Sequence, residues 1–444
     1  MDYRPTDEQL QAIDVASCVI DDPANGKFDV MARAFADPTV FEMELQKIFY
    51  STWVYLAHES QIPNPHDFFA TQIGRQPVVL TRGPEGDIHC FLNTCSHRGA
   101  KLTTTQRGNR KNFMCPFHGW VYDHTGRCVD VNNQAKGGYS AHFEQQSHDL
   151  RKPARFGNYR GFLFASLNPD VEDLETHLGG SRTIIDMFAD QSEDGLEILP
   201  GGIKYTCDAN WKIQLENIDG YHFFPVHVNY IQLIQRRMQK ESGNQVKTID
   251  PSQMSELPGG SYEFENGHGM DWGFMPNGDD RPLGFQRDKM ESRFGKDRSR
   301  WMIDHVRNLV VYPNVLFMDQ SSSTVRVIHP IAVDKTFIEV YCIAPKGEPK
   351  AARERRVRQF EDFLGPAGLA TPDDQAVMEQ CQRGLQANQI QGLQAYYRGI
   401  TRVTEGADEE ARKVGIAPLK SNNDIDDETF VHSQYREWLR LMTA

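Results

Sequence analysis

Two short cysteine–histidine pairs constrain this 444-residue chain more than any other feature. The pairs are Cys95-x-His97 and Cys115-x-x-His118, and seventeen residues lie between them. Two thiolates and two imidazoles that are brought together by two tight turns are typical of a metal site. The segment that carries them is therefore expected to fold around that site.

The mixed composition of each pair indicates which metal is bound. A structural zinc site usually offers pairs of like residues, such as C-x-x-C or H-x-x-x-H. A mixed pair allows both thiolates to bind one metal and both imidazoles another. That division describes a Rieske [2Fe–2S] centre, which has two cysteines on one iron and two histidines on the other. A structural zinc site and a set of four unrelated buried residues are the alternatives.

Length and charge limit the remaining possibilities. A chain of 444 residues is too long for one ordinary core, so two domains are expected. The net charge of −13 argues against binding to nucleic acid. No apolar run approaches the ~18–20 residues that span a membrane, and the acidic start "MDYRPTDEQLQAIDV" has no signal core. Eight scattered cysteines are typical of a reduced, cytoplasmic protein.

The distribution of residue types along the sequence predicts an α+β protein with three segments. Residues 1–50 are expected to be helical, because "DPTVFEMELQKIFYSTW" has apolar residues at helical spacing. Short alternating runs broken by Gly, Pro and Asn predict a small antiparallel β domain over residues 51–165. Residues 166–444 mix predicted helices and strands. We expect a larger α+β domain there, with a central antiparallel sheet on which the N-terminal helical segment packs.

A second candidate metal site follows in "NWKIQLENIDGYHFFPVH", residues 210–227. His222 and His227 lie five residues apart on a predicted helix, in polar company. Two histidines and one carboxylate on Fe(II) leave positions open where O₂ and a substrate can meet. The carboxylate is sought far along the chain, where Asp373 and Asp374 begin a predicted helix after Pro372. Acidic residues at that position also complement a helix dipole without binding any metal.

The motif "CSHRGA…CPFHGW" resembles the Rieske motif of the α subunits of aromatic-ring-hydroxylating oxygenases, and the resemblance extends over essentially the whole chain. It implies that Cys95 and Cys115 bind one iron of the cluster. It implies that His97 and His118 bind the other. It also implies that single electrons pass from the cluster to the second metal site.

The same resemblance implies roles for the residues of the second site. Asp374 is the third ligand of the mononuclear iron, beside His222 and His227. Asp219, three residues before the first histidine, bridges the two metal sites across a subunit boundary by hydrogen bonds to a histidine on each side. This arrangement implies a trimer of α subunits. Only Ile218 separates Asn217 from Asp219, fewer residues than the family usually has, so no role is assigned to Asn217.

The segments "VRNLVVYPNVLFMDQSSSTVRVIHP" and "RVRQFEDFLGPAGLATPDD" resemble the benzoate, anthranilate and 2-halobenzoate dioxygenase branch. The resemblance implies a small β subunit in an α3β3 assembly. It also implies an NADH-dependent flavin/iron–sulfur reductase, with or without a ferredoxin. The expected reaction adds both atoms of O₂ to an aromatic ring and gives a cis-dihydrodiol. The alternatives are a ring monohydroxylase such as a salicylate hydroxylase, and a Rieske electron-transfer protein whose second site is not catalytic.

An aromatic carboxylate requires a cation in an otherwise apolar pocket, and Arg326 is the candidate. It lies between Val325 and Val327, so alternation places its side chain on one face of a predicted strand. A guanidinium suits bidentate binding of a carboxylate. The alternative is that this face of the strand is solvated. The basic run Arg353, Arg355, Arg356 and Arg358 is interpreted as an exposed helix face.

Overall fold

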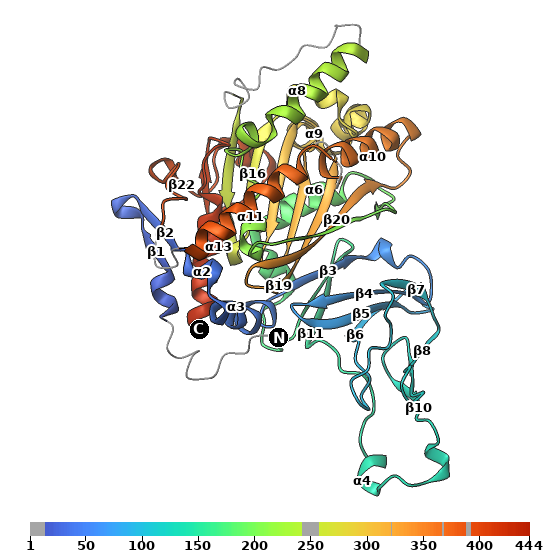
Figure 1. The fold of residues 1–444 in the computed structure, drawn as a ribbon. Coiled ribbons are helices and arrows are strands. Elements are labelled where there is room, and N and C mark those ends of the chain that lie inside the picture. Colours follow the sequence, from blue (N-terminus) through green and yellow to red (C-terminus); the bar gives the residue numbers. More distant parts are fainter. Residues whose placement is uncertain (1–13, 242–256, 321, 366–367, 388–391) are drawn as a thin grey trace. The chain divides into compact units, whose positions relative to one another are not determined.

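The computed structural model describes residues 14–241, 257–320, 322–365, 368–387 and 392–444. The chain forms two compact units, and one is inserted into the sequence of the other (Figure 1). The inserted unit is Phe49–Leu174, and the described residues before and after it form the second unit. The inserted unit is longer at both ends than the predicted 51–165. Its last turn is held by Trp53, whose Nε1 donates to the Glu172 carbonyl at 2.8 Å.

The inserted unit is an antiparallel β structure built from three small sheets, with strand orders β11-β12-β3, β6-β5-β4-β7 and β10-β9-β8. Two of its strands are wholly buried, namely β3 and Phe162–Ser166 (β12), whereas β7 is exposed along its whole length. The other strands are Val54–His58 (β3), Asp67–Ile73 (β4), Gln76–Arg82 (β5), Ile88–Leu92 (β6), Arg107–Asn109 (β7), Asn112–Met114 (β8), Val121–Asp123 (β9), Cys128–Asp130 (β10) and Arg155–Tyr159 (β11).

The second unit is organised on a long antiparallel sheet, with the order β13-β20-β19-β18-β17-β16-β15-β23-β22 and with β14 also paired to β20 (Figure 1). Several central strands, such as β18, are buried on both faces, because helices pack on the sheet. The strands are Leu196–Ile198 (β13), Ile203–Cys207 (β14), Gly259–Glu263 (β15), Gly269–Phe274 (β16), His305–Val311 (β17), Val315–Asp319 (β18), Ser323–Ala332 (β19), Lys335–Pro345 (β20), Thr404–Glu405 (β22) and Lys420–Asn422 (β23).

Helices α8 and α11 pack against each other beside this sheet, and α11 also contacts β14 (Figure 1). Asp373 and Asp374 lie in the first turn of α11, where acidic side chains complement the helix dipole. The helices of this unit that matter below are Pro38–Glu44 (α3), Trp211–Glu216 (α7), Phe223–Glu241 (α8), Lys350–Leu364 (α10), Thr371–Ala387 (α11) and Phe430–Thr443 (α13).

The N-terminal segment is not helical throughout, which corrects the prediction for residues 1–50. Val19–Asp22 (β1) and Lys27–Met31 (β2) form an antiparallel hairpin. Asp22, Pro23 and Gly26 form its turn, and Gly26 adopts a left-handed conformation with φ of 63°. The alternation of buried Phe28 and Val30 is a strand pattern. The helix prediction rested on the apolar spacing of residues 37–53 and did not take this alternation into account. The predicted helix after Asp37 is present as α3, and residues 1–13 lie outside the described part.

Helix α3 is tied into the second unit by a buried carboxylate. Glu44, at the end of α3, is fully buried and forms an ion pair with the buried Lys212 of α7. It also accepts hydrogen bonds from the indole N–H groups of Trp211 and Trp438, both at 2.7 Å. Elements from the beginning, middle and end of the chain therefore meet at one side chain.

The mixture of antiparallel sheets and helices confirms the predicted α+β class. The small unit is all-β apart from short helical turns, and the larger unit combines its sheet with helices. Among the helices of the described residues, none has both the length and the apolar character that crossing a bilayer requires.

Candidate metal centres

Two equivalent loops present the cysteine–histidine pairs in the inserted unit. In the first loop the Cys95 N–H donates to the Ala100 carbonyl and the Gly99 N–H donates to the Cys95 carbonyl, both at 2.9 Å. The second loop repeats this pattern with Cys115, Gly119 and Trp120, at 2.7 and 3.0 Å. The two glycines have φ of 73° and 75°, which side chains with a Cβ atom rarely adopt. The backbone of each loop thus folds back on its cysteine.

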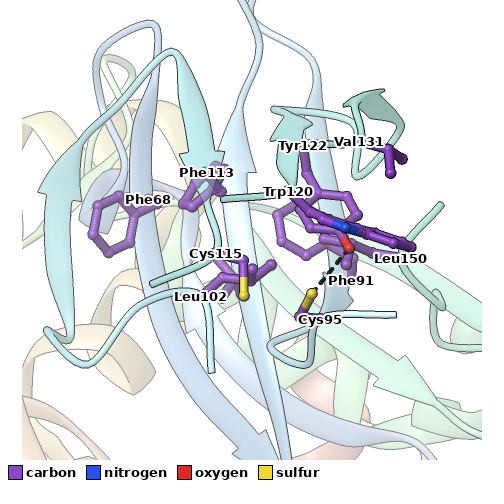
Figure 2. Close-up of a cluster of buried hydrophobic side chains, with 11 residues drawn as sticks. Phe68, Phe91, Cys95, Leu102, Phe113, Cys115, Trp120, Tyr122, Val131 and Leu150 are labelled. Carbon is purple, nitrogen blue, oxygen red and sulfur yellow. Dashed lines mark hydrogen bonds between the residues drawn. The ribbon is translucent and has the colours of Figure 1, made fainter. Parts of the chain in front are cut away.

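The four side chains divide by burial. Cys95 and Cys115 belong to the buried cluster in Figure 2. Burial raises the pKa of the Cys95 thiol above its usual value, and the neighbouring Cys115 thiol raises it as well. His97 and His118 are partly exposed, and their ring centroids lie 4.5 Å apart. The His97 Nδ1 atom is buried and has no hydrogen-bond partner among the described residues. Two buried thiols and two adjacent imidazoles with an open nitrogen fit a [2Fe–2S] cluster.

Tyr122 supports the cysteine side of this site. Its hydroxyl lies 3.2 Å from the Cys95 Sγ atom, as the dashed line in Figure 2 marks. The Ser96 N–H donates to the same hydroxyl oxygen at 3.2 Å. Burial raises the pKa of Tyr122 further above its usual value, and the hydroxyl stays protonated. When Cys95 binds iron as a thiolate it has no proton to donate, so its sulfur would accept the hydrogen bond from this hydroxyl.

Replacing Tyr122 by phenylalanine should lower the reduction potential of the cluster by roughly 50 mV, because the sulfur loses one hydrogen bond of about 1 kcal/mol. A reduced cluster carries more negative charge on its sulfurs and gains most from such a bond. A redox titration followed by electron paramagnetic resonance measures the shift. Tyr139→Phe, at an exposed position of the same unit, is the control. An intact cluster with unchanged potential in Tyr122→Phe would contradict this role.

The second site lies in the other unit, at the turn between α7 and α8. His222 immediately precedes α8, and His227 lies in its first turns. The prediction that both histidines lie on one helix is therefore wrong for His222. Its position is set by Asp219, whose Oδ1 accepts the His222 backbone N–H at 2.8 Å. A side-chain acceptor at such a turn competes with helix formation.

Asp374 of α11 completes the site from a distant part of the chain. Its Oδ1 atom lies 3.1 Å from His227 Nε2 and 3.6 Å from His222 Nε2. The three ligand atoms all lie within 4.8 Å of one another. Asp374 and His227 are buried. Two imidazole nitrogens and one carboxylate oxygen around one point fit a mononuclear iron with open positions.

A chain of hydrogen bonds connects this site to the sheet. His222 Nδ1 lies 2.8 Å from Asp219 Oδ2, which leaves His222 Nε2 facing the other two ligands. The Asn217 amide nitrogen lies 3.2 Å from His222 Nε2. The Asn217 oxygen in turn accepts a hydrogen bond from Arg326 Nη1 at 2.9 Å. Asn217, to which the sequence assigned no role, thus lies between a candidate ligand and the candidate substrate residue.

A cavity of about 130 Å³ opens beside the three ligand atoms. A dry cavity of about 150 Å³ accommodates benzene, so this volume suits one aromatic ring. Its apolar wall comes from α8, α10 and the sheet, and includes Phe223, Tyr230, Val306, Met318 and Phe363. Its polar lining includes Asn217, Asp271, Asn308, Gln320 and Arg326.

Arg326 lines this cavity and is only 2% exposed, so the solvated-strand alternative does not apply. The sequence reasoning missed Asp271 and Asn308. Asp271 is the one charged residue in the otherwise apolar and glycine-rich "GMDWGF", and that contrast is a signal that could have found it. Asn308 lies in "HVRNLVV" beside other polar residues, so its sequence carries no such signal.

Comparison with known families divides the chain as the structure does. Residues 52–149 match the Rieske [2Fe-2S] domain. Residues 199–443 match the catalytic domain of the ring hydroxylating alpha subunit. All four candidate cluster ligands lie in the first match, and all three candidate ligands of the mononuclear iron lie in the second.

Curated relatives align along almost the whole chain. Toluate 1,2-dioxygenase subunit alpha of Pseudomonas putida is 43% identical, over 96% of this chain and 94% of the relative. The 2-halobenzoate 1,2-dioxygenase large subunit of Burkholderia cepacia is 41% identical, over 96% and 92%. The anthranilate 1,2-dioxygenase large subunit of Acinetobacter baylyi is 39% identical, over 96% and 92%.

Among solved structures, naphthalene 1,2-dioxygenase from Rhodococcus sp. has the same fold, with a TM-score of 0.81, 24% identity and 98% of each chain covered. The matched domains, the aligned relatives and the two candidate metal centres lead to one conclusion. The chain belongs to the ring-hydroxylating dioxygenase α subunits, the oxidoreductases that join a Rieske [2Fe–2S] domain to a mononuclear iron domain.

Proposed function

We propose that this oxygenase α subunit acts on a benzoate-type aromatic carboxylate. The reaction consumes the arene, O₂, NADH and one proton, and yields a cis-dihydrodiol and NAD⁺. Both oxygen atoms form bonds to adjacent ring carbons, and the two electrons come from NADH through a reductase. The observation that carries the proposal is a buried arginine, Arg326, in a cavity that suits one aromatic ring. The aligned relatives are named for toluate, 2-halobenzoate and anthranilate, which supports it.

We assign Cys95, His97, Cys115 and His118 to the [2Fe–2S] cluster. We assign His222, His227 and Asp374 to the mononuclear Fe(II). When bound, these groups supply single electrons and the activation of O₂. The protein residues hold the ring beside the three ligands, exclude bulk water with the apolar wall of the cavity and fix the imidazole of His222 through Asp219.

The environment of Arg326 requires an anion. The Nη1 atom donates a hydrogen bond to the side-chain oxygen of Asn217, which carries no charge. The Nε atom has no hydrogen-bond partner in the described part of the chain. No carboxylate of the described residues forms an ion pair with this guanidinium. A buried charge without a counter-ion is costly. A substrate carboxylate would supply the missing charge and would fix the ring in one orientation.

Arg326→Gln should raise the KM for benzoate roughly 30-fold, because a hydrogen bond to a charged group contributes about 2 kcal/mol. The activity with benzamide, which has the same shape and no charge, should change little. Steady-state product formation with both compounds in the reconstituted system measures the difference. Arg326→Lys, which keeps the charge without the planar fork, should recover part of the affinity. An equal loss for benzoate and benzamide would show that Arg326 acts only on the fold.

We further propose that the chain works in an assembly. The names of its relatives as "subunit alpha" and "large subunit" support a partner subunit. We propose a small β subunit, an α3β3 arrangement and an NADH-dependent flavin/iron–sulfur reductase. Asp219 would then connect the mononuclear site of one subunit to a cluster histidine of the next. Native mass spectrometry of the co-expressed subunits tests the stoichiometry.

A further inference from the structure

The cavity has a second polar wall that the proposed function does not use. Asp271 of β16 and Asn308 of β17 are directly paired across the sheet. Asp271 is 1% exposed, Asn308 is 4% exposed, and both line the cavity. The next strand, β18, places Met318 opposite Asn308, and β19 follows with Arg326. The pair and Arg326 therefore lie on opposite sides of β18.

The oxygen atoms of this pair lack partners. Neither carboxyl oxygen of Asp271 has a hydrogen-bond partner among the described residues. The Asn308 Oδ1 atom has none there either. Buried polar atoms in folded proteins are almost always hydrogen-bonded, so three unpartnered oxygens side by side require an explanation. Among the other acids that line the described cavity, Asp219 bonds to His222, and Asp374 Oδ1 faces the two candidate ligand histidines. Asp426 has one oxygen without a partner, but its other oxygen pairs with Arg398, whereas both oxygens of Asp271 lack one.

The protonation state of Asp271 limits which substrate groups could form hydrogen bonds with it. Burial and the nearby charge of Asp219 raise the pKa of Asp271 well above its usual value. A neutral carboxyl group offers one O–H donor and one acceptor oxygen. Asn308 adds a further acceptor. A small group that donates hydrogen bonds and also accepts one, such as an amino or a hydroxyl group, matches this wall.

We propose that Asp271 and Asn308 form a subsite for a hydrogen-bond-donating substituent on the substrate ring. The inference rests on the proposed function, in which Arg326 holds the ring carboxylate. It narrows the substrate class to aromatic carboxylates that carry an amino or hydroxyl group. The ring would lie over Met318, with its carboxylate directed at Arg326 and its substituent directed at the pair. A site built to hydrogen-bond a substituent discriminates against analogues that lack it, because its own polar atoms are then left unpaired.

Equilibrium binding to the anaerobic, iron-loaded enzyme tests this without relying on turnover. Isothermal titration should give Kd values about tenfold lower for the best amino- or hydroxybenzoate isomer than for benzoate and the matching methylbenzoate. Asp271→Leu and Asn308→Leu should each remove that preference while the enzyme still binds benzoate. Ser261→Ala is the matched control. Ser261 pairs with Asp271 in the same row of the sheet but bonds to Thr429 and does not line the cavity.

The possible outcomes separate this inference from the proposed function. If no aromatic carboxylate binds, the proposed function fails. If benzoate binds through Arg326 and no donor-bearing isomer binds better, only the subsite is wrong, and the pair holds ordered water only. A preference that survives in Asp271→Leu and Asn308→Leu also overturns the assignment. If Asp271→Leu does not fold, Asn308→Leu and the wild-type preference still decide the question.

Discussion

Replacing Asp374 by alanine should abolish oxygenation, with a loss of product of at least roughly 1,000-fold, and leave the Rieske absorption spectrum intact. The carboxylate is the only acidic group that the described residues place beside both His222 and His227. Removing one of three ligands leaves a pair of imidazoles that bind Fe(II) weakly. The cluster ligands lie in the other unit and should be unaffected. Iron analysis should fall from three to two atoms per chain while acid-labile sulfide stays at two. His222→Ala and His227→Ala should behave in the same way.

Asp373→Ala provides the matched control for that result. Asp373 is the adjacent carboxylate in the first turn of α11. It does not belong to the cluster of candidate ligands formed by His222, His227 and Asp374. Its loss should cost only the favourable interaction with the helix dipole, about 0.5 kcal/mol, and turnover should remain close to normal. If Asp374→Ala keeps near-normal turnover while Asp373→Ala loses it, the third ligand is misassigned.

Asp219→Asn should leave both metal centres occupied and slow electron arrival at the mononuclear iron on the order of 100-fold. Both carboxylate oxygens hold His222, one at its backbone N–H and one at Nδ1. Asparagine keeps the volume but loses the charge, and it can accept at only one of these two positions. The imidazole would then lose the partner that fixes its tautomer and orientation. In the proposed assembly the same change also weakens the link to the neighbouring cluster.

Single-turnover experiments distinguish this role from a purely structural one. Enzyme with a pre-reduced cluster is mixed with O₂ and substrate, and the re-oxidation of the cluster is followed by absorption. Slow re-oxidation with normal iron content supports the connecting role of Asp219. If Asp219 only stabilises the turn, the substitution should cost about 1 kcal/mol of stability, and the cluster should re-oxidise at the wild-type rate.

The parts of this protein that could be predicted from its sequence are those specified by local spacing. The two cysteine–histidine pairs each occupy one tight loop, so four residue identities at fixed spacing were enough to predict the Rieske domain that the family match confirms. The strand alternation also placed Arg326 on a particular face. The burial of that face could not be predicted, because it depends on helices that pack on the sheet from distant parts of the chain.

Asp271 and Asn308 illustrate the same limit more strongly. The two residues lie in separate strands, more than 30 positions apart in the sequence, and only the pairing of β16 with β17 brings them together. Arg356 was interpreted as solvated because of its charged neighbours, yet it is buried against Glu348 and Ser323. Helical periodicity alone does not reveal which acidic residue from elsewhere pairs with a basic one.

The insertion of one unit into the other has a consequence for the order of events on the ribosome. The inserted unit is one uninterrupted stretch of chain, so all its strands and all four candidate cluster ligands are synthesised before the second half of the protein. The other unit is completed later, because the hydrogen bond between Glu44 and Trp438 joins its first described helices to α13. All four candidate cluster ligands are therefore available for iron–sulfur loading before Asp374, the last candidate ligand of the mononuclear iron, has been synthesised.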